Sequence, residues 1–193
     1  MTAPPARVGI VGPILGHHPG WVVSQGERLA EQLAGDGLAV KTTSGRIRRL
    51  PRALDTAKTM RSWKGAVDVV VVMVFSGPAF AMSDLASRSA LALGVPVALW
   101  LHGGNLPTFS ERHPRWVRRV FERAEVLVAP TTYLQSVGEA WGRPCVVIDN
   151  LSPDEPAPFE RRGRREPRLL WMRTFHPLYR PELAVEVLGE LVR

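Results

Sequence analysis

Hydrophobic and polar positions along this chain fall into blocks of two kinds. Short apolar runs rich in β-branched residues, such as 67–75, lack the alternation of a half-exposed strand and predict strands buried on both faces. Longer segments carry apolar residues at helical spacing, as Leu29 and Leu33 do within 22–37. The pattern predicts strands at 7–12, 38–44, 67–75, 95–104, 125–130 and 144–150, and helices at 22–37, 50–65, 78–94, 114–124 and 132–142.

Alternation of six strands with helices is typical of one architecture. It predicts an α/β fold with a Rossmann-like, mostly parallel sheet, right-handed crossovers and helices on both faces. Ligands of such sheets bind at the carboxyl ends of the strands, where the strand order reverses. The segments to examine for function are therefore those that directly follow strands, namely 12–20, 76–78, 102–105 and 130–132.

The pattern changes after residue 150. Residues 151–167 are rich in proline and charge and lack apolar periodicity, which is typical of a linker. Residues 168–172 then predict a new strand, and Pro181 opens an amphipathic helix. The sequence thus predicts a Rossmann-like domain over 1–150, a linker, and in 168–193 the first strand–loop–helix of an incomplete second domain. A lone strand and helix cannot bury their apolar faces, so we expect this last segment to be poorly packed.

Charge narrows the class of partner. The chain has 25 basic against 18 acidic residues, a net charge of +7, and three basic clusters at 46–52, 112–123 and 161–168. Such clusters bind nucleic acid, an anionic membrane surface or phosphorylated ligands, and are equally common on solvated faces. Trp116 and Phe121 have core spacing within the second cluster, so we predict no nucleic-acid partner.

Apolar content and cysteine usage bear on the compartment. The start of the chain has no secretory signal pattern, and the longest apolar stretches, 69–75 and 90–101, fall short of the roughly 20 residues that span a bilayer. The single cysteine, Cys145, excludes an internal disulfide and predicts a small core residue. We expect a cytoplasmic protein. The basic helix predicted at 114–124 also allows peripheral contact with the inner face of an anionic membrane.

Two turns carry candidate chemistry. Gly12 and Gly16 lie in a turn from a strand into a helix, where backbone N–H groups can approach a phosphate or a sugar, although a tight turn without ligand fits as well. His102 and Gly103 follow the predicted strand 95–101 at its carboxyl end. A histidine there can hydrogen-bond a sugar hydroxyl or stabilise developing charge, or simply cap the turn.

Other catalytic patterns are absent from the sequence. There is no GxSxG, CxxC or HExxH segment and no Asp-X-Asp pair, and the adjacent His17 and His18 would not chelate one metal from a helix face, so we predict no metal site. Arg173 directly follows the predicted strand 168–172. Its guanidinium suits bidentate contact with a phosphate, and a plain surface position is the alternative.

Three features occur in a fixed order along the chain. They are the glycine-rich turn, His–Gly after a central strand, and "APTTYLQS…VVIDN" leading through a linker to a strand and an arginine. In this order they resemble the family 4 glycosyltransferases of the GT-B fold, over essentially the whole chain. In that family an N-terminal Rossmann-like domain holds the acceptor, a C-terminal one holds the nucleotide sugar, and the reaction runs between them.

The resemblance implies a glycosyltransferase that moves a sugar from a UDP- or GDP-sugar to a sugar or lipid-linked acceptor, with retention and without metal or cofactor. It places Gly12 and Gly16 near the donor phosphate and acceptor, and His102, the catalytic candidate, beside the transferred sugar with Gly103. Thr131 and Thr132 correspond to a serine-containing segment of the family. Arg173 matches the arginine that grips the donor diphosphate.

Two departures accompany the resemblance. The family's Lys–Gly pair after that arginine is replaced by Tyr179 and Arg180, and Arg180 is the residue here that offers the charge. The family's paired glutamates are not located, because the chain ends before their domain is complete. The chain alone is therefore expected to be inactive. The alternative is a stand-alone, non-catalytic Rossmann-like module that binds a nucleotide or a partner.

Overall fold

The chain forms two units, Met1–Ser152 (unit 1) and Pro153–Arg193 (unit 2). The structure is a computed structural model that describes residues 7–152, 158, 161, 168–172, 175 and 177–192. None of the helices within these residues is long and apolar enough to cross a bilayer.

Unit 1 is built on a six-stranded sheet in which every strand pair is parallel. The spatial order is β2-β1-β3-β4-β5-β6, so the direction of strand addition reverses between β1 and β3. The predicted α/β, Rossmann-like fold is thereby confirmed. The strands are β1 (Arg7–Val11), β2 (Ala39–Thr43), β3 (Val69–Val74), β4 (Val97–Leu101), β5 (Val126–Ala129) and β6 (Cys145–Val147).

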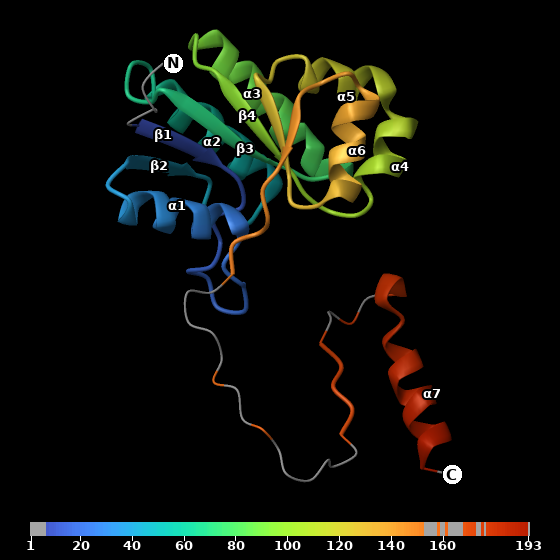
Figure 1. The fold of residues 1–193 in the computed structure, drawn as a ribbon. Helices are drawn as coiled ribbons and strands as arrows, with labels where there is room; N and C mark the ends of the chain where they lie inside the picture. The colour runs from blue at the N-terminus through green and yellow to red at the C-terminus, as the bar shows by residue number, and fades with distance from the viewer. Residues whose placement is uncertain are drawn as a thin grey trace. The chain divides into compact units, whose positions relative to one another are not determined.

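The helices of unit 1 cover the two faces of this sheet unequally (Figure 1). Five helices contribute side chains to the core on one face, whereas α1 alone packs on the other. Right-handed crossovers explain this, because only the step from β1 to β2 runs opposite to all later steps. The helices are α1 (Gln25–Gly35), α2 (Arg49–Arg61), α3 (Phe80–Ala92), α4 (Leu106–Arg112), α5 (Pro114–Phe121) and α6 (Thr132–Ala140).

Two local differences from the predicted elements have clear causes. The sequence pattern missed α4, because its seven residues give too few repeats for a periodicity, although Leu106 and Phe109 are buried. Helix α1 begins at Gln25, three residues later than predicted. Ser24 has extended backbone angles and its hydroxyl accepts a hydrogen bond from the N–H of Glu27, which fixes the helix start.

A salt bridge joins the start of β1 to the residue before β3. The Arg7 guanidinium pairs with the Asp68 carboxylate at 2.5 Å and also donates to the carbonyl of Gly65 at 2.6 Å. The Asp68 carboxylate accepts a further bond from the backbone N–H of Arg7. This contact holds together two points that are 61 residues apart in the sequence.

Unit 2 departs from the prediction in one element. Residues 168–172, predicted as a strand, carry no strand assignment, since a strand is stable only beside a partner that accepts its backbone hydrogen bonds. The helix expected from Pro181 is present as α7 (Pro181–Leu191), preceded by the short 3-10 helix η2 (Pro177–Tyr179). No residue of α7 is buried, and its Leu183 and Leu188 are among several exposed apolar side chains.

Candidate functional site

Two neighbouring cavities lie at the carboxyl edge of the sheet in unit 1. They share Pro13, Met73 and Phe75. The larger, of about 300 Å³, opens where the strand order reverses, and we call it the switch-point cavity. It is lined by Gly12, Pro13, Met73 and Phe75 from the strand ends and by Arg52, Thr56 and Met82 from α2 and α3. The smaller, of about 220 Å³, is lined by the shared residues with Ser24, Gln25, Gly26 and His102, and we call it the histidine cavity.

His102 is held firmly at the end of β4. Its backbone N–H donates to the carbonyl of Val74 at 2.8 Å, and the side chain is 7% exposed. The imidazole lies nearly parallel to the rings of Phe75 and Trp100, with centroids 5.1 Å and 5.9 Å away. Its Nε2 is 3.2 Å from the sulfur of Met73. The predicted histidine therefore lies beside two aromatic rings and one methionine sulfur, and these contacts fix its ring.

Burial sets the protonation state of His102. Removing the imidazole from water disfavours the cation and lowers its pKa to about 4. The ring is therefore neutral at physiological pH, with one nitrogen that donates and one that accepts. It can hydrogen-bond a sugar hydroxyl in the histidine cavity, but it does not supply a positive charge there.

The turn between β1 and α1 uses its N–H groups internally. Gly12 donates to the carbonyl of Thr43 at 2.8 Å. Gly16 donates to one carboxylate oxygen of Glu27 at 2.8 Å, and Ser24 donates to the other at 2.7 Å. Glu27 thus places its own negative charge at the N-terminal end of α1, where a bound phosphate would otherwise lie.

Replacing Glu27 with glutamine should open this turn to anions. We expect a loss of about 1 kcal/mol in the free energy of unfolding, because the capping box and its charge at the helix end are weakened. On addition of inorganic phosphate, the amide resonance of Gly16 should then move in the variant and stay still in the native chain. Glu31→Gln, on the exposed side of α1, is the matched control. An equal phosphate response of Gly16 in the native chain would contradict this account.

Three more predicted residues lie at the same edge but line neither cavity. Gly103 has a left-handed backbone, with φ of 85°, which suits the turn after β4. Thr131 caps α6 by accepting the N–H of Leu134 at 3.3 Å, and Thr132 is the first residue of that helix. The hydroxyl of Tyr133 donates to the carbonyl of Gly104 at 3.2 Å, which ties this helix start to the turn that holds Gly103.

Of the two arginines predicted to bind the donor diphosphate, the structure describes only Arg180. Arg173 lies outside the described residues. Arg180 directly precedes α7, and its Nε is 3.6 Å from a carboxylate oxygen of Glu182 on an exposed surface. Arg180 was expected to offer its positive charge to a nucleotide-sugar donor, and the carboxylate of Glu182 partly balances that charge.

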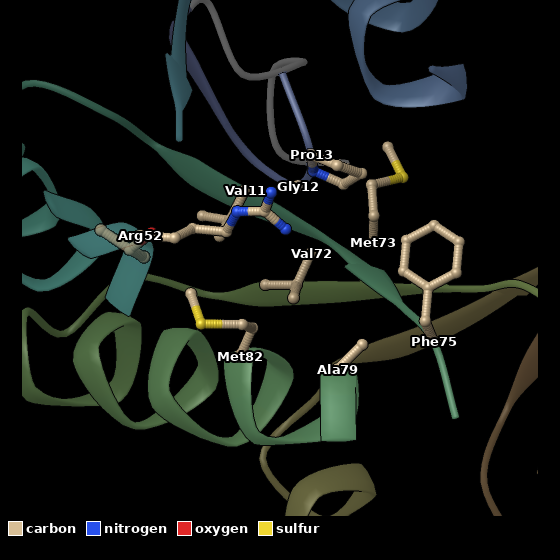
Figure 2. A pocket seen from close by; sticks show the side chains of 10 residues that line it. Val11, Gly12, Pro13, Arg52, Val72, Met73, Phe75, Ala79 and Met82 are labelled. Atoms are coloured by element: carbon tan, nitrogen blue, oxygen red, sulfur yellow. The ribbon is translucent and has the colours of Figure 1, made fainter. Parts of the chain in front are cut away.

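Sequence reasoning missed the two residues with polar side chains that line the switch-point cavity, Arg52 and Thr56. Arg52 lies in the basic cluster 46–52, for which the sequence left open nucleic acid, an anionic membrane, phosphorylated ligands or a solvated face. Figure 2 shows its side chain reaching from α2 toward Val11 and Gly12 at the end of β1. Thr56, one helical turn further along α2, is fully buried. The i, i+4 spacing of the two residues was the signal available in the sequence.

Comparison with known proteins identifies no family for this chain. Within the described segments, no three His, Cys, Asp or Glu side chains are grouped so that they could hold a metal ion. No protein-family model and no curated protein sequence matches this chain. The chain is a Rossmann-like α/β protein, and the two cavities described above lie at the carboxyl edge of its sheet.

Proposed function

We propose that this chain carries the acceptor-binding half of a GT-B glycosyltransferase of the family 4 type. Its activity is the transfer of a sugar from a UDP- or GDP-sugar to an acceptor hydroxyl, with retention and without a metal. The observation that carries the proposal is His102, a neutral imidazole held at the carboxyl end of a central strand in a cavity beside the β1–α1 turn. That edge is where parallel sheets of this type bind their ligands.

The chemistry asked of unit 1 is positioning. In the transfer, the bond between the sugar and the diphosphate breaks, a bond to the acceptor oxygen forms, and the hydroxyl proton passes to the departing diphosphate or to solvent. His102, with its ring fixed by Phe75 and Trp100, offers a hydrogen bond to a hydroxyl of the transferred sugar. Arg173 and Arg180 would stabilise the leaving diphosphate. Holding the reactants in line and balancing developing charge are large sources of catalysis that need no covalent intermediate.

Saturation-transfer difference NMR with UDP-glucose and GDP-mannose tests this proposal on the chain itself. We expect the sugar-ring protons of at least one donor to receive saturation from the native chain. The effect should fall several-fold in His102→Phe, which keeps an aromatic ring beside Phe75 and Trp100 but has no ring nitrogen. Absence of sugar-ring saturation with both donors, or equal saturation in native and variant chains, would overturn the proposal.

One observation favours a second candidate function, a non-catalytic binding module. The N-terminal end of α1 is already occupied by the carboxylate of Glu27, so the most obvious phosphate site in unit 1 is filled from within. Calorimetric titration of UDP and GDP into Arg173→Ala separates the two candidates. Binding by a transferase should be abolished in this variant, whereas a module that binds through unit 1 should be almost unaffected.

A further inference from the structure

The switch-point cavity is apolar apart from two groups. Its walls are formed by strand-end and helix residues without polar side chains, among them Pro13, Met73, Phe75 and Met82. The two polar exceptions, Arg52 and Thr56, both come from α2. A cavity of this size is at the small end of the range for ligand pockets, about 300 to 1,000 Å³. Its size and lining therefore fit a small molecule that is mostly hydrophobic.

Arg52 brings a positive charge to this cavity that the described residues leave without an acidic partner. Of its five N–H donors, Nε donates to the carbonyl of Arg46 at 2.7 Å and Nη2 to that of Ile47 at 3.1 Å. These two bonds fix the guanidinium and leave other donors free. Burial and the nearby charge of Arg49 both lower the pKa of Arg52, which shows that its surroundings disfavour the cation. An anion in the cavity would relieve that penalty.

Thr56 adds an unused hydrogen-bonding group to the same wall. Its side chain is fully buried and lines the cavity, and its hydroxyl has no hydrogen-bond partner among the described residues. A buried polar group without a partner is costly and uncommon in folded proteins. Its position one turn after Arg52 means that one small head group could engage both side chains.

The place of the cavity in the fold agrees with a ligand site. It opens between β1 and β3, where the strand order reverses, which is the usual binding crevice of an open parallel sheet. Met73 and Phe75 separate it from the histidine cavity, since both residues line both spaces. A ligand here would therefore contact the wall behind His102 without occupying the space proposed for the sugar.

We propose that the switch-point cavity binds a small amphiphile, with an apolar body and a single anionic head that is a carboxylate or a phosphate. The apolar body packs against Met73, Phe75 and Met82, and the head is bound by Arg52 with the hydroxyl of Thr56 nearby. This ligand differs in chemistry from a nucleotide sugar, which is polar throughout its sugar. The proposal goes beyond the transferase function and does not require it.

Methionine methyl NMR tests the proposal in the whole chain. The sequence holds five methionines, of which Met73 and Met82 line the cavity, Met60 is buried elsewhere in the core and Met172 is exposed in unit 2. With ¹³C-methyl methionine, octanoate and octyl phosphate should move the signals of Met73 and Met82 and leave those of Met60 and Met172 in place. 1-Octanol should bind at least about tenfold more weakly than either, because it lacks the charge that Arg52 recognises. Acetate and inorganic phosphate, which lack the apolar body, should move neither signal.

Two variants make the test specific. Arg52→Gln should weaken the binding of octanoate and octyl phosphate by about tenfold and leave the binding of 1-octanol unchanged. Arg48→Gln, an exposed residue of the same cluster, should change none of them. An unchanged Met60 signal in each variant shows that the core is intact. Equal binding of octanol and octanoate, no movement of Met73 and Met82 with any amphiphile, or movement of all methionine signals together would each overturn the proposal. A stronger response to octanoate than to octyl phosphate, or the reverse, identifies the head group as carboxylate or phosphate and supports it.

Discussion

Replacing Asp84 with alanine is expected to lower the free energy of unfolding of unit 1 by about 3 kcal/mol. Asp84 lies on α3 and its carboxylate is 2.6 Å from the guanidinium of Arg123, with both side chains largely buried. The same carboxylate accepts from the indole N–H of Trp116 at 2.9 Å and from Arg88. Removal of the carboxylate leaves the charge of Arg123 without its partner in a poorly hydrated position, and that is the main cause of the loss. Urea denaturation followed by tryptophan fluorescence measures it.

The pH dependence of this loss identifies the charge as its source. Burial by itself raises the pKa of Asp84, but the hydrogen bonds from Arg123, Trp116 and Arg88 outweigh it, so the pKa lies below its ordinary value of 3.8. A lowered carboxyl pKa gives stability that is present above the unfolded value and lost as the pH falls through the folded one. The difference in the free energy of unfolding between native chain and variant should therefore have its full value at pH 6 and become smaller below about pH 4. Asp36→Ala, at the exposed end of α1, is the control and should show a much smaller gap at every pH.

Acidification from pH 6.5 to pH 4 is expected to cost the folded chain about 3 kcal/mol through His102 alone. Burial lowers the pKa of this histidine from 6.5 to about 4, so across that interval the unfolded state binds a proton that the folded state excludes. Because the unfolded state then binds more protons, the free energy of unfolding falls as the pH falls. Below pH 4 the folded state is protonated too, and this contribution to the slope ends.

His102→Phe separates this effect from the other titrating groups. The variant keeps an aromatic ring beside Phe75 and Trp100 but has no imidazole to protonate, so the loss of stability between pH 6.5 and pH 4 should be smaller than in the native chain by the contribution of His102. In the native chain, the ring nitrogens of His102 followed by ¹⁵N NMR should titrate with a midpoint near pH 4. A midpoint near 6.5, or an unchanged stability slope in the variant, would refute the assignment.

The fold followed from the sequence because its signals are local and repeated. An apolar run such as 69–75 marks a strand buried on both faces, and six predicted strands separated by helices leave few topologies. The failures occurred where the local signal was short or the partner was missing. Helix α4 spans under two full turns, and residues 168–172 have the composition of a strand but pair with no strand among the residues that the structure describes.

The candidate site could be predicted only in part. His102 and Gly12 were found because residues that directly follow strands meet at one edge of a parallel sheet. That rule says nothing of side-chain direction, so it could not show that Arg52 lines a cavity. The capping of α1 by Glu27 is local, and the Ser24–Glu27 spacing of a capping box was its signal in the sequence. The place of Arg52 in the cavity depends instead on how α2 packs beside the strand ends.

The strand order also has a consequence for how the nascent chain acquires structure. Only β3 pairs with a strand other than the one before it in the sequence, since it lies beside β1 and not beside β2. The Arg7–Asp68 contact joins the two ends of the intervening segment, which are 61 residues apart. Each of β4, β5 and β6 pairs with the strand before it in the sequence, and the connecting helices pack on the same face of the sheet as α2. Loop closure is slowest for distant pairings, so the β1–β3 step is the entropic bottleneck. Once it has formed, β4, β5 and β6 can dock in the order in which the ribosome releases them.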